Sequence, residues 1–102
     1  MKGTMVRYKV KADCAAKNER YIARVFEQLD RDKPAGIRYA TFKLDDGVSF
    51  VHIAFHDAAD GRNPLTELAA FKAFAAGVKD RCEEPPIAVQ LNEIGSYGFF
   101  GR

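Results

Sequence analysis

Tryptophan is absent from this sequence of 102 residues, and cysteine occurs only twice. Cys14 and Cys82 are too few for a disulfide scaffold, and neither has a second cysteine or a histidine at the spacing of a metal site. We therefore expect no metal and two free thiols. In the topology derived below, both would lie at the same edge of the helix layer, which leaves a facultative disulfide open.

Long apolar runs and a strong charge of one sign are also missing. No stretch approaches the ~20 residues of a membrane span, and the basic N-terminus lacks the apolar stretch of a signal peptide. The 16 basic and 14 acidic residues leave a formal charge of +2, which is too small to indicate nucleic acid or an acidic membrane as a partner. We expect a cytoplasmic protein with neither partner.

The length suits one domain, over residues 1–102, and the periodicity of the sequence predicts six elements in it. Strand-like alternation and helix-like spacing follow one another without repeats or linkers. The predicted order is a strand over 4–11, a helix over 13–31, strands over 37–44 and 48–56, a helix over 64–82 and a strand over 87–94. Residues 57–63 form a polar loop, and residues 95–100 form an aromatic tail.

This order is β-α-β-β-α-β, the split βαβ pattern of the ferredoxin-like α+β fold. Right-handed crossovers place both helices on one face of a four-stranded antiparallel sheet. Between the two middle strands, Asp46-Gly47 favours a two-residue turn, which pairs Phe42 with Val51 and Thr41 with His52. Paired residues share a face, so the hairpin has one apolar face and one mixed face.

We expect the helices to cover the apolar face. That face consists of Val6, Tyr8, Val10, Ala40, Phe42, Leu44, Val51, Ile53, Phe55, Ile87, Val89 and Leu91. The opposite face collects Arg7, Lys9, Tyr39, Thr41, Phe50, His52, Ala54, Ala88, Gln90, Asn92 and Ile94. It is too polar for a core and too aromatic for a solvated surface. Two sheets that pack through it into a dimeric barrel would explain this mixture.

The order of elements, the hairpin over 36–47 and the helix entry Asn63-Pro64-Leu65 resemble the dimeric α/β-barrel superfamily. Within it, the chain is similar to small antibiotic-biosynthesis-monooxygenase-like proteins. The resemblance implies a homodimer with a cavity in each protomer. It also implies oxidation of aromatic substrates by dioxygen without metal or flavin, so we expect no cofactor; relatives degrade haem or perform isomerisations. Tryptophan, which helps to form the site in several of those enzymes, is missing here.

His52 is the candidate catalytic residue, because it lies in mid-strand on the mixed face and its charge changes near neutral pH. The alternative is a structural histidine that is hydrogen-bonded to Thr41. The candidate substrate-binding residues share the same face: Arg7, Tyr39, Thr41, Phe50, Gln90 and Asn92. Arg7 suits an anionic group, Tyr39 and Phe50 suit an aromatic ring, and the two amides suit a carbonyl.

We therefore predict a homodimer that binds a small aromatic or acidic organic molecule, with a monooxygenase-like or isomerase-like activity. The alternative is a non-catalytic binding or dimerisation module. An RNA-recognition module shares the topology, but it needs a basic residue and a stacking aromatic where this chain has Asp46 and Val48. That class is disfavoured.

Overall fold

The fold is described from a computed structural model, which covers residues 2–57 and 62–99. Most of the loop predicted over 57–63, and Phe100 of the predicted tail, lie outside the described residues. The elements follow one another as β1 (Lys2–Val10), the 3₁₀ turn η1 (Ala12–Cys14), α1 (Ala15–Asp32), β2 (Ile37–Lys43), β3 (Ser49–His56), α2 (Pro64–Glu67), α3 (Ala69–Arg81) and β4 (Cys82–Leu91).

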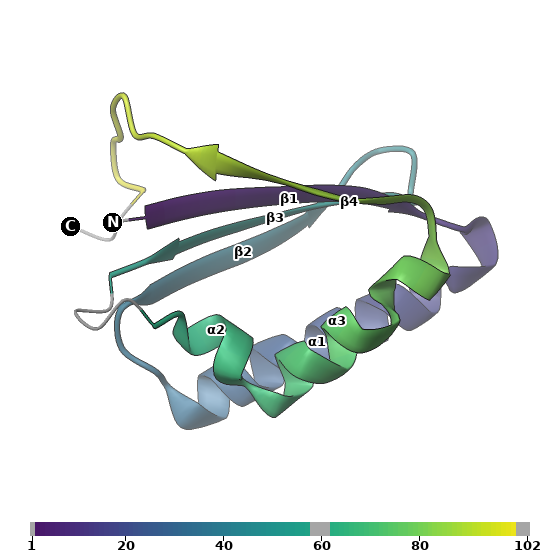
Figure 1. The fold of residues 1–102 in the computed structure, drawn as a ribbon, viewed down its shortest axis with the longest axis horizontal. Coiled ribbons are helices and arrows are strands. Elements are labelled where there is room, and N and C mark those ends of the chain that lie inside the picture. Colours follow the sequence, from purple (N-terminus) through teal and green to yellow (C-terminus); the bar gives the residue numbers. More distant parts are fainter. Residues whose placement is uncertain (1, 58–61, 100–102) are drawn as a thin grey trace.

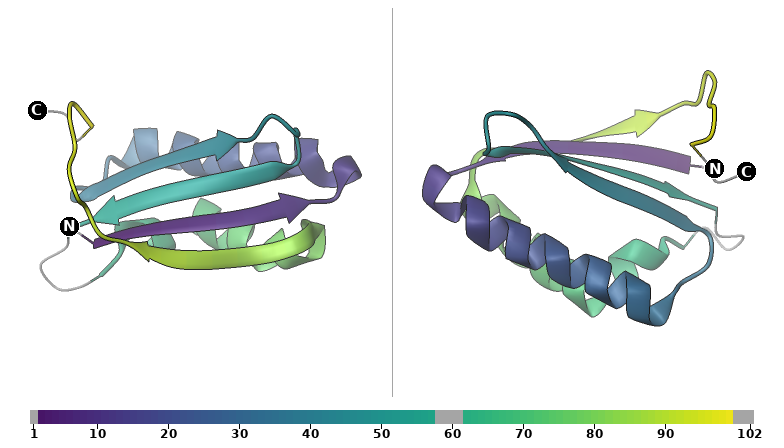
Figure 2. Two further views of the ribbon diagram at one scale, coloured as in Figure 1. Left: turned by 90° about the horizontal axis from the view of Figure 1, so that it is seen from above. Right: turned by 180° about the vertical axis from the view of Figure 1, so that it is seen from behind.

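The four strands form one antiparallel sheet in the order β2-β3-β1-β4. The helices α1 and α3 lie side by side beneath one face of this sheet, and no described helix covers the other face (Figures 1 and 2). The predicted α+β, ferredoxin-like architecture is therefore confirmed. No helix among the described residues is long and apolar enough to cross a membrane. Cys14 and Cys82 are free and partly buried.

The register of the central hairpin is also confirmed. Phe42 pairs with Val51 and Thr41 with His52, as predicted. The predicted two-residue turn is wrong, because the Gly47 amide bonds to the Leu44 carbonyl and the Leu44 amide bonds to the Ser49 carbonyl, which leaves the four residues 45–48 as the connection. The Asp46 carboxylate stabilises this connection, since it accepts hydrogen bonds from the backbone amides of Val48 and Ser49 and from the Ser49 hydroxyl. These bonds, with the Ser49 hydroxyl first, lower the pKa of Asp46 to about 2.

The assignment of the sheet faces is wrong for every strand except β1. Val6, Tyr8 and Val10 face the helices as predicted, but their neighbours on β3 are His52 and Phe50. The mixed face of the hairpin therefore lies against the helices. The opposite, open face carries the apolar residues Met5, Phe42, Val51, Ile53, Phe55, Ile87, Val89 and Leu91. The mixed face is able to be a core because its polar groups bond to one another and to polar side chains from the helix layer.

The second predicted helix is broken at Leu68, whose extended backbone separates α2 from α3. The new helix start has no side-chain cap of its own. Instead the Gln28 side chain, from α1, accepts a hydrogen bond of 2.9 Å from the Ala70 amide. A tertiary contact therefore satisfies a helix end that the local sequence leaves open.

The last strand begins at Cys82, five residues before its predicted start. Pro85 and Pro86 have no amide hydrogen to donate, so they favour a strand start after them. However, β4 is at the edge of the sheet, where one side of each residue needs no partner strand. Edge position therefore tolerates the two prolines within the strand.

Candidate functional site

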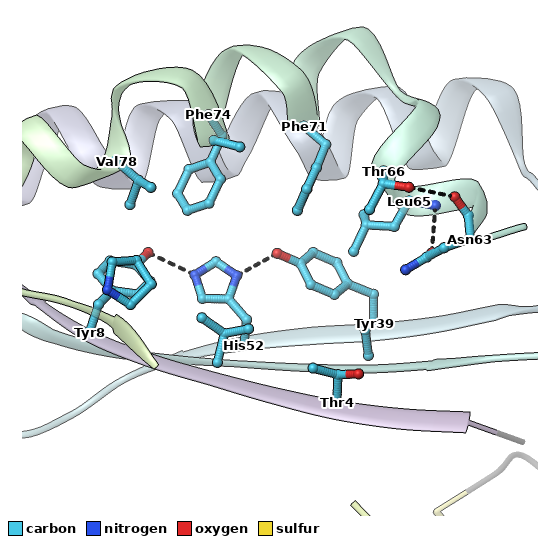
Figure 3. Close-up of a pocket in the computed structure, with 14 residues that line it drawn as sticks. Thr4, Tyr8, Tyr39, His52, Asn63, Leu65, Thr66, Phe71, Phe74 and Val78 are labelled. Atoms are coloured by element: carbon cyan, nitrogen blue, oxygen red, sulfur yellow. Dashed lines mark hydrogen bonds between the residues drawn. The ribbon is translucent and has the colours of Figure 1, made fainter. Parts of the chain in front are cut away.

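A cavity of about 280 Å³ lies between the sheet and the α2–α3 segment. Most of its walls are apolar, and the polar groups lie on the strand side and at the start of α2, where Asn63 and Thr66 are found (Figure 3). Its lining comprises Thr4, Val6, Tyr8, Tyr39, His52, Ala54, Asn63, Leu65, Thr66, Phe71, Phe74, Ala75, Val78 and Pro86. The sequence predicted a cavity on the sheet face away from the helices. That placement is wrong, because this cavity lies on the helix side of the sheet.

Strands β1, β3 and β2 place three side chains in a row along the strand side of the cavity, opposite Phe71 and Phe74 of α3 (Figure 3). The Tyr8 hydroxyl lies 2.7 Å from His52 Nε2, and the Tyr39 hydroxyl lies 2.5 Å from His52 Nδ1. Thr41 Oγ1 is 3.1 Å from the same Nδ1. Both ring nitrogens of His52 are therefore hydrogen-bonded.

Two side chains from the helix layer continue the row beyond Tyr8. Asn18 of α1 is fully buried and donates from Nδ2 to the Tyr8 hydroxyl at 2.9 Å. Arg81, the last residue of α3, is only 4% exposed and donates from Nε to Asn18 Oδ1 at 3.1 Å and from Nη2 to the Phe74 carbonyl at 3.0 Å. Its guanidinium also lies 4.5 Å from the ring centre of Tyr21, which is a cation–π contact.

Burial sets the protonation of the row. It lowers the pKa of His52 from 6.5 to about 4, because a charged ring would lose its hydration. It raises the pKa of Tyr39 to about 12, opposed by the Thr41 hydroxyl, and it raises the pKa of Tyr8 still further, opposed by the Asn18 amide. At neutral pH the row therefore holds a neutral imidazole between two protonated phenols.

The candidate residues from the sequence are divided by this geometry. His52 and Tyr39 line the cavity, and Thr41 bonds to His52 beside it. Phe50 is 1% exposed and stacks on Tyr8 with ring centres 5.6 Å apart, so it belongs to the core rather than to the cavity lining.

Three further candidates lie elsewhere. Arg7 is exposed on the open face of the sheet, on the opposite side from His52. Gln90 and Asn92 are exposed at and beyond the end of the edge strand β4, and neither lines the cavity. None of the three lines the cavity, so they do not form the binding site there that was predicted for them.

Sequence reasoning missed Asn18 and Arg81, although the helical spacing contains a signal for both. Asn18 interrupts the apolar stripe of α1, three residues after Ala15 and four before Ile22. Arg81 follows Val78 at the same spacing on α3. A polar residue on an apolar stripe is buried with it and needs a partner. Tyr8 was correctly predicted to face the helices, but as an apolar core residue only.

Among residues 2–57 and 62–99, no three His, Cys, Asp or Glu side chains gather in a way that could hold a metal ion. The metal-free site stays a prediction.

Fold and cavity together define a ferredoxin-like α+β protein with an internal site between sheet and helices, and solved structures share this fold. A putative antibiotic biosynthesis monooxygenase from Nitrosomonas europaea superposes with a TM-score of 0.76 at 23% identity, over 93% of this chain and 100% of that one. Another from Caulobacter crescentus has a TM-score of 0.70 at 20% identity, over 92% of this chain and 90% of that one.

SnoaB from Streptomyces nogalater, a cofactor-independent oxygenase, has a TM-score of 0.66 at 20% identity, over 93% of this chain and 95% of the other. No family model matches the chain, and no curated protein matches it. The chain thus has the fold of antibiotic biosynthesis monooxygenase-like proteins, as the resemblance in its sequence predicted.

Proposed function

We propose that the protein binds a small aromatic molecule in the cavity between sheet and helices, and oxidises it with dioxygen without a metal or flavin. The observation that carries this proposal is the cavity itself, with apolar walls and a hydrogen-bonded Tyr-His-Tyr row on one side. Cavities for small organic ligands range over roughly 300–1,000 Å³. A volume of about 280 Å³ suits a ligand of one or two rings.

The likeness to SnoaB, named as a cofactor-independent oxygenase, supports the oxidation step. Without a metal or flavin, the substrate must supply the electrons that reduce dioxygen. An electron-rich phenol meets this need: 1-naphthol and one dioxygen give 1,4-naphthoquinone and one water, which balances atoms and electrons.

A second candidate function is non-catalytic binding of the same kind of molecule. It is favoured by one observation: both nitrogens of His52 are engaged by hydroxyl groups, so the ring has no free lone pair to act as a general base. The two functions differ in turnover, not in binding.

We expect Ala75→Phe, which places a ring in the cavity, to abolish binding of bicyclic aromatic probes, with an affinity loss of at least about tenfold. Ala75 of α3 lines the cavity at its open side, whereas its neighbour Ala76, which is exposed like Ala75, does not line it. Ala76→Phe is therefore the matched control. Binding of tetralin and of 1-naphthol is measured by NMR titration, and oxygen uptake with 1-naphthol by an oxygen electrode in the presence of EDTA.

Wild type and Ala76→Phe should bind both probes and consume one dioxygen per naphthol oxidised, whereas Ala75→Phe should do neither. If wild type binds 1-naphthol but consumes oxygen no faster than buffer alone, the proposed oxygenase activity is rejected and non-catalytic binding remains. Equal binding by Ala75→Phe and Ala76→Phe would reject the cavity as the site.

We also propose that the protein is a homodimer, formed through the open face of the sheet. That face carries apolar side chains on all four strands, with Arg7 among them, and Phe42, Ile87 and Val89 are 51%, 67% and 41% exposed. An apolar surface of this extent is rare on a monomer. A second copy of the chain offers the same surface, as a twofold interface requires. The cytoplasmic location expected from the sequence stays a prediction.

Phe42→Glu should convert the dimer into a monomer, because Phe42 is paired with the apolar Val51 and a carboxylate there would be buried twice in a twofold interface without a partner. We expect dimer affinity to fall on the order of a hundredfold or more. Gln90→Glu adds the same charge on the other face of the sheet, where the residue is exposed, and should leave the dimer intact. Light scattering measures the mass against the 11.4 kDa chain. A wild-type protein that is monomeric at high concentration would overturn this interface.

A further inference from the structure

The hydrogen bonds behind the cavity have a direction, and it starts at Arg81. A guanidinium has donors and no acceptor. The Asn18 atom that faces Arg81 Nε at 3.1 Å must therefore be its carbonyl oxygen, which leaves the amide nitrogen toward Tyr8. Within the described residues Arg81 forms no ion pair, so this donor is directed at Asn18 without a competing carboxylate.

The Tyr8 hydroxyl accepts from Asn18, so its own hydrogen is directed to the next group, His52 Nε2, at 2.7 Å. If Nε2 carried a hydrogen instead, the Tyr8 hydrogen would be buried without an acceptor, since Tyr8 is 2% exposed. That arrangement is disfavoured by on the order of tenfold or more in population. Nε2 is therefore the unprotonated nitrogen of the neutral ring.

The single hydrogen of the neutral imidazole is then on Nδ1. This tautomer is assigned from the order of donors and acceptors along the row. Nδ1–H donates to the Tyr39 oxygen, 2.5 Å away, with Thr41 at 3.1 Å beside it. The Tyr39 oxygen is thus an acceptor toward His52, and its own hydrogen has two possible acceptors, the neighbouring Thr41 hydroxyl and a ligand atom in the cavity. A ligand oxygen replaces Thr41 as the acceptor, and Thr41 keeps its contact with His52 Nδ1. Tyr39 lines the cavity (Figure 3).

We infer that Tyr39 donates a hydrogen bond to an acceptor oxygen on the aromatic ligand, a ketone carbonyl or an ionised phenol. The inference rests on the proposed function, and it adds which ligands the cavity selects. Arg81, Asn18, Tyr8, His52 and Tyr39 form the donor chain, in which each member donates to the next and the last donates to the ligand. His52 is a positioning residue in this chain, because it orients the Tyr39 hydroxyl and does not take a proton from the ligand.

The donor chain begins at a buried positive charge and ends at the cavity. Each hydrogen bond polarises the next one in surroundings of low dielectric constant. A partial or full negative charge on the ligand oxygen is therefore favoured at the Tyr39 hydroxyl. A hydrocarbon of the same shape gains nothing from it.

The test compares 1-tetralone with tetralin, which have the same ring frame with and without a carbonyl oxygen. Wild type should bind 1-tetralone about tenfold more tightly, the worth of one buried hydrogen bond. Tyr39→Phe should bind the two probes equally and keep its affinity for tetralin. Tyr97→Phe removes the same hydroxyl from a fully exposed ring and should keep the tenfold preference.

Asn18→Asp should reverse the donor chain by replacing the amide nitrogen with an oxygen. The new carboxylate accepts from Arg81 and from Tyr8, so Tyr8 accepts from His52 and the ring hydrogen moves to Nε2. Tyr39 then donates to Nδ1 and no longer to the ligand. Long-range ¹H–¹⁵N NMR should show Nδ1–H in wild type and Nε2–H in the variant, and the preference for 1-tetralone should disappear. A purely structural role of Asn18 would not move the ring hydrogen.

The outcomes separate this inference from the proposed function. If wild type binds both probes with equal affinity, Tyr39 is not a donor to the ligand, whereas the cavity remains a binding site. An Nε2–H ring in the wild-type protein overturns the donor chain by itself, whether or not the variants fold. If neither probe binds wild type, the proposed function is overturned and the inference with it.

Discussion

Phe50→Ala is expected to lower the free energy of unfolding by about 4 kcal/mol, a large fraction of the about 5–15 kcal/mol that stabilises a domain of this size. Phe50 is 1% exposed and stacks on Tyr8, so its removal leaves a cavity between the sheet and α1. Phe42→Ala is the matched control. Phe42 is on the adjacent strand of the same hairpin but faces the other way, and it is 51% exposed.

The cost of Phe42→Ala should be less than about 1 kcal/mol in dilute protein, as for other exposed positions, and should grow with concentration as the dimer forms. Urea unfolding at two protein concentrations measures both effects. If Phe50→Ala does not fold, the loss in free energy of unfolding is measured on Phe50→Leu, which removes less side-chain volume. A larger and concentration-independent loss for Phe42→Ala would mean that the helices cover the face predicted from the sequence.

Stability should fall by about 3 kcal/mol as the pH drops from 6.5 toward 4, through His52 alone. The folded protein lowers the pKa of His52 to about 4, so between these values the unfolded chain binds the proton and the folded chain does not. The contribution of His52 is therefore fully present above pH 6.5 and is lost in this window. The polar groups in contact with the ring are the hydroxyls of Tyr8, Tyr39 and Thr41, and none of them loses its proton in this pH range.

Urea unfolding as a function of pH measures this dependence, and NMR titration of the ring measures the pKa directly. His52→Gln should remove the slope between pH 4 and 6.5, and His56→Gln should retain it. Asp46 does not interfere, because its pKa is lowered from 3.8 to about 2 and its stabilisation is lost in a lower pH range. An unchanged slope in His52→Gln would contradict the burial of a neutral ring.

The elements and the hairpin register could be predicted because their causes are local. The chain reverses over residues 44–49, where the Asp46 carboxylate accepts from the Val48 and Ser49 amides, and this local turn sets each β2–β3 pair. The alternation in β1 likewise placed Tyr8 toward the helices. By contrast, the break at Leu68 depends on Gln28, which is 42 residues away from its partner Ala70. No local pattern contains that contact.

The face of the sheet that the helices cover could not be predicted, for a similar reason. Alternation divides a strand into two sets of residues but does not say which set meets the helices. The more apolar set was the natural choice for the core, since burying a lone polar group costs free energy. That cost disappears here because Tyr8, His52, Tyr39, Asn18 and Arg81 bond to one another.

The sequence by itself determined the strand and helix order, the hairpin pairs and the candidacy of His52 and Tyr39, because local spacing and turn chemistry specify them. Only the tertiary structure decided where those two residues lie, what they bond to and which sheet face is open. These features depend on contacts between β1, β3, α1 and α3, which are far apart in the chain. The core is able to include a buried polar row, while apolar side chains remain on the open face, because the polar partners come together only when the chain folds.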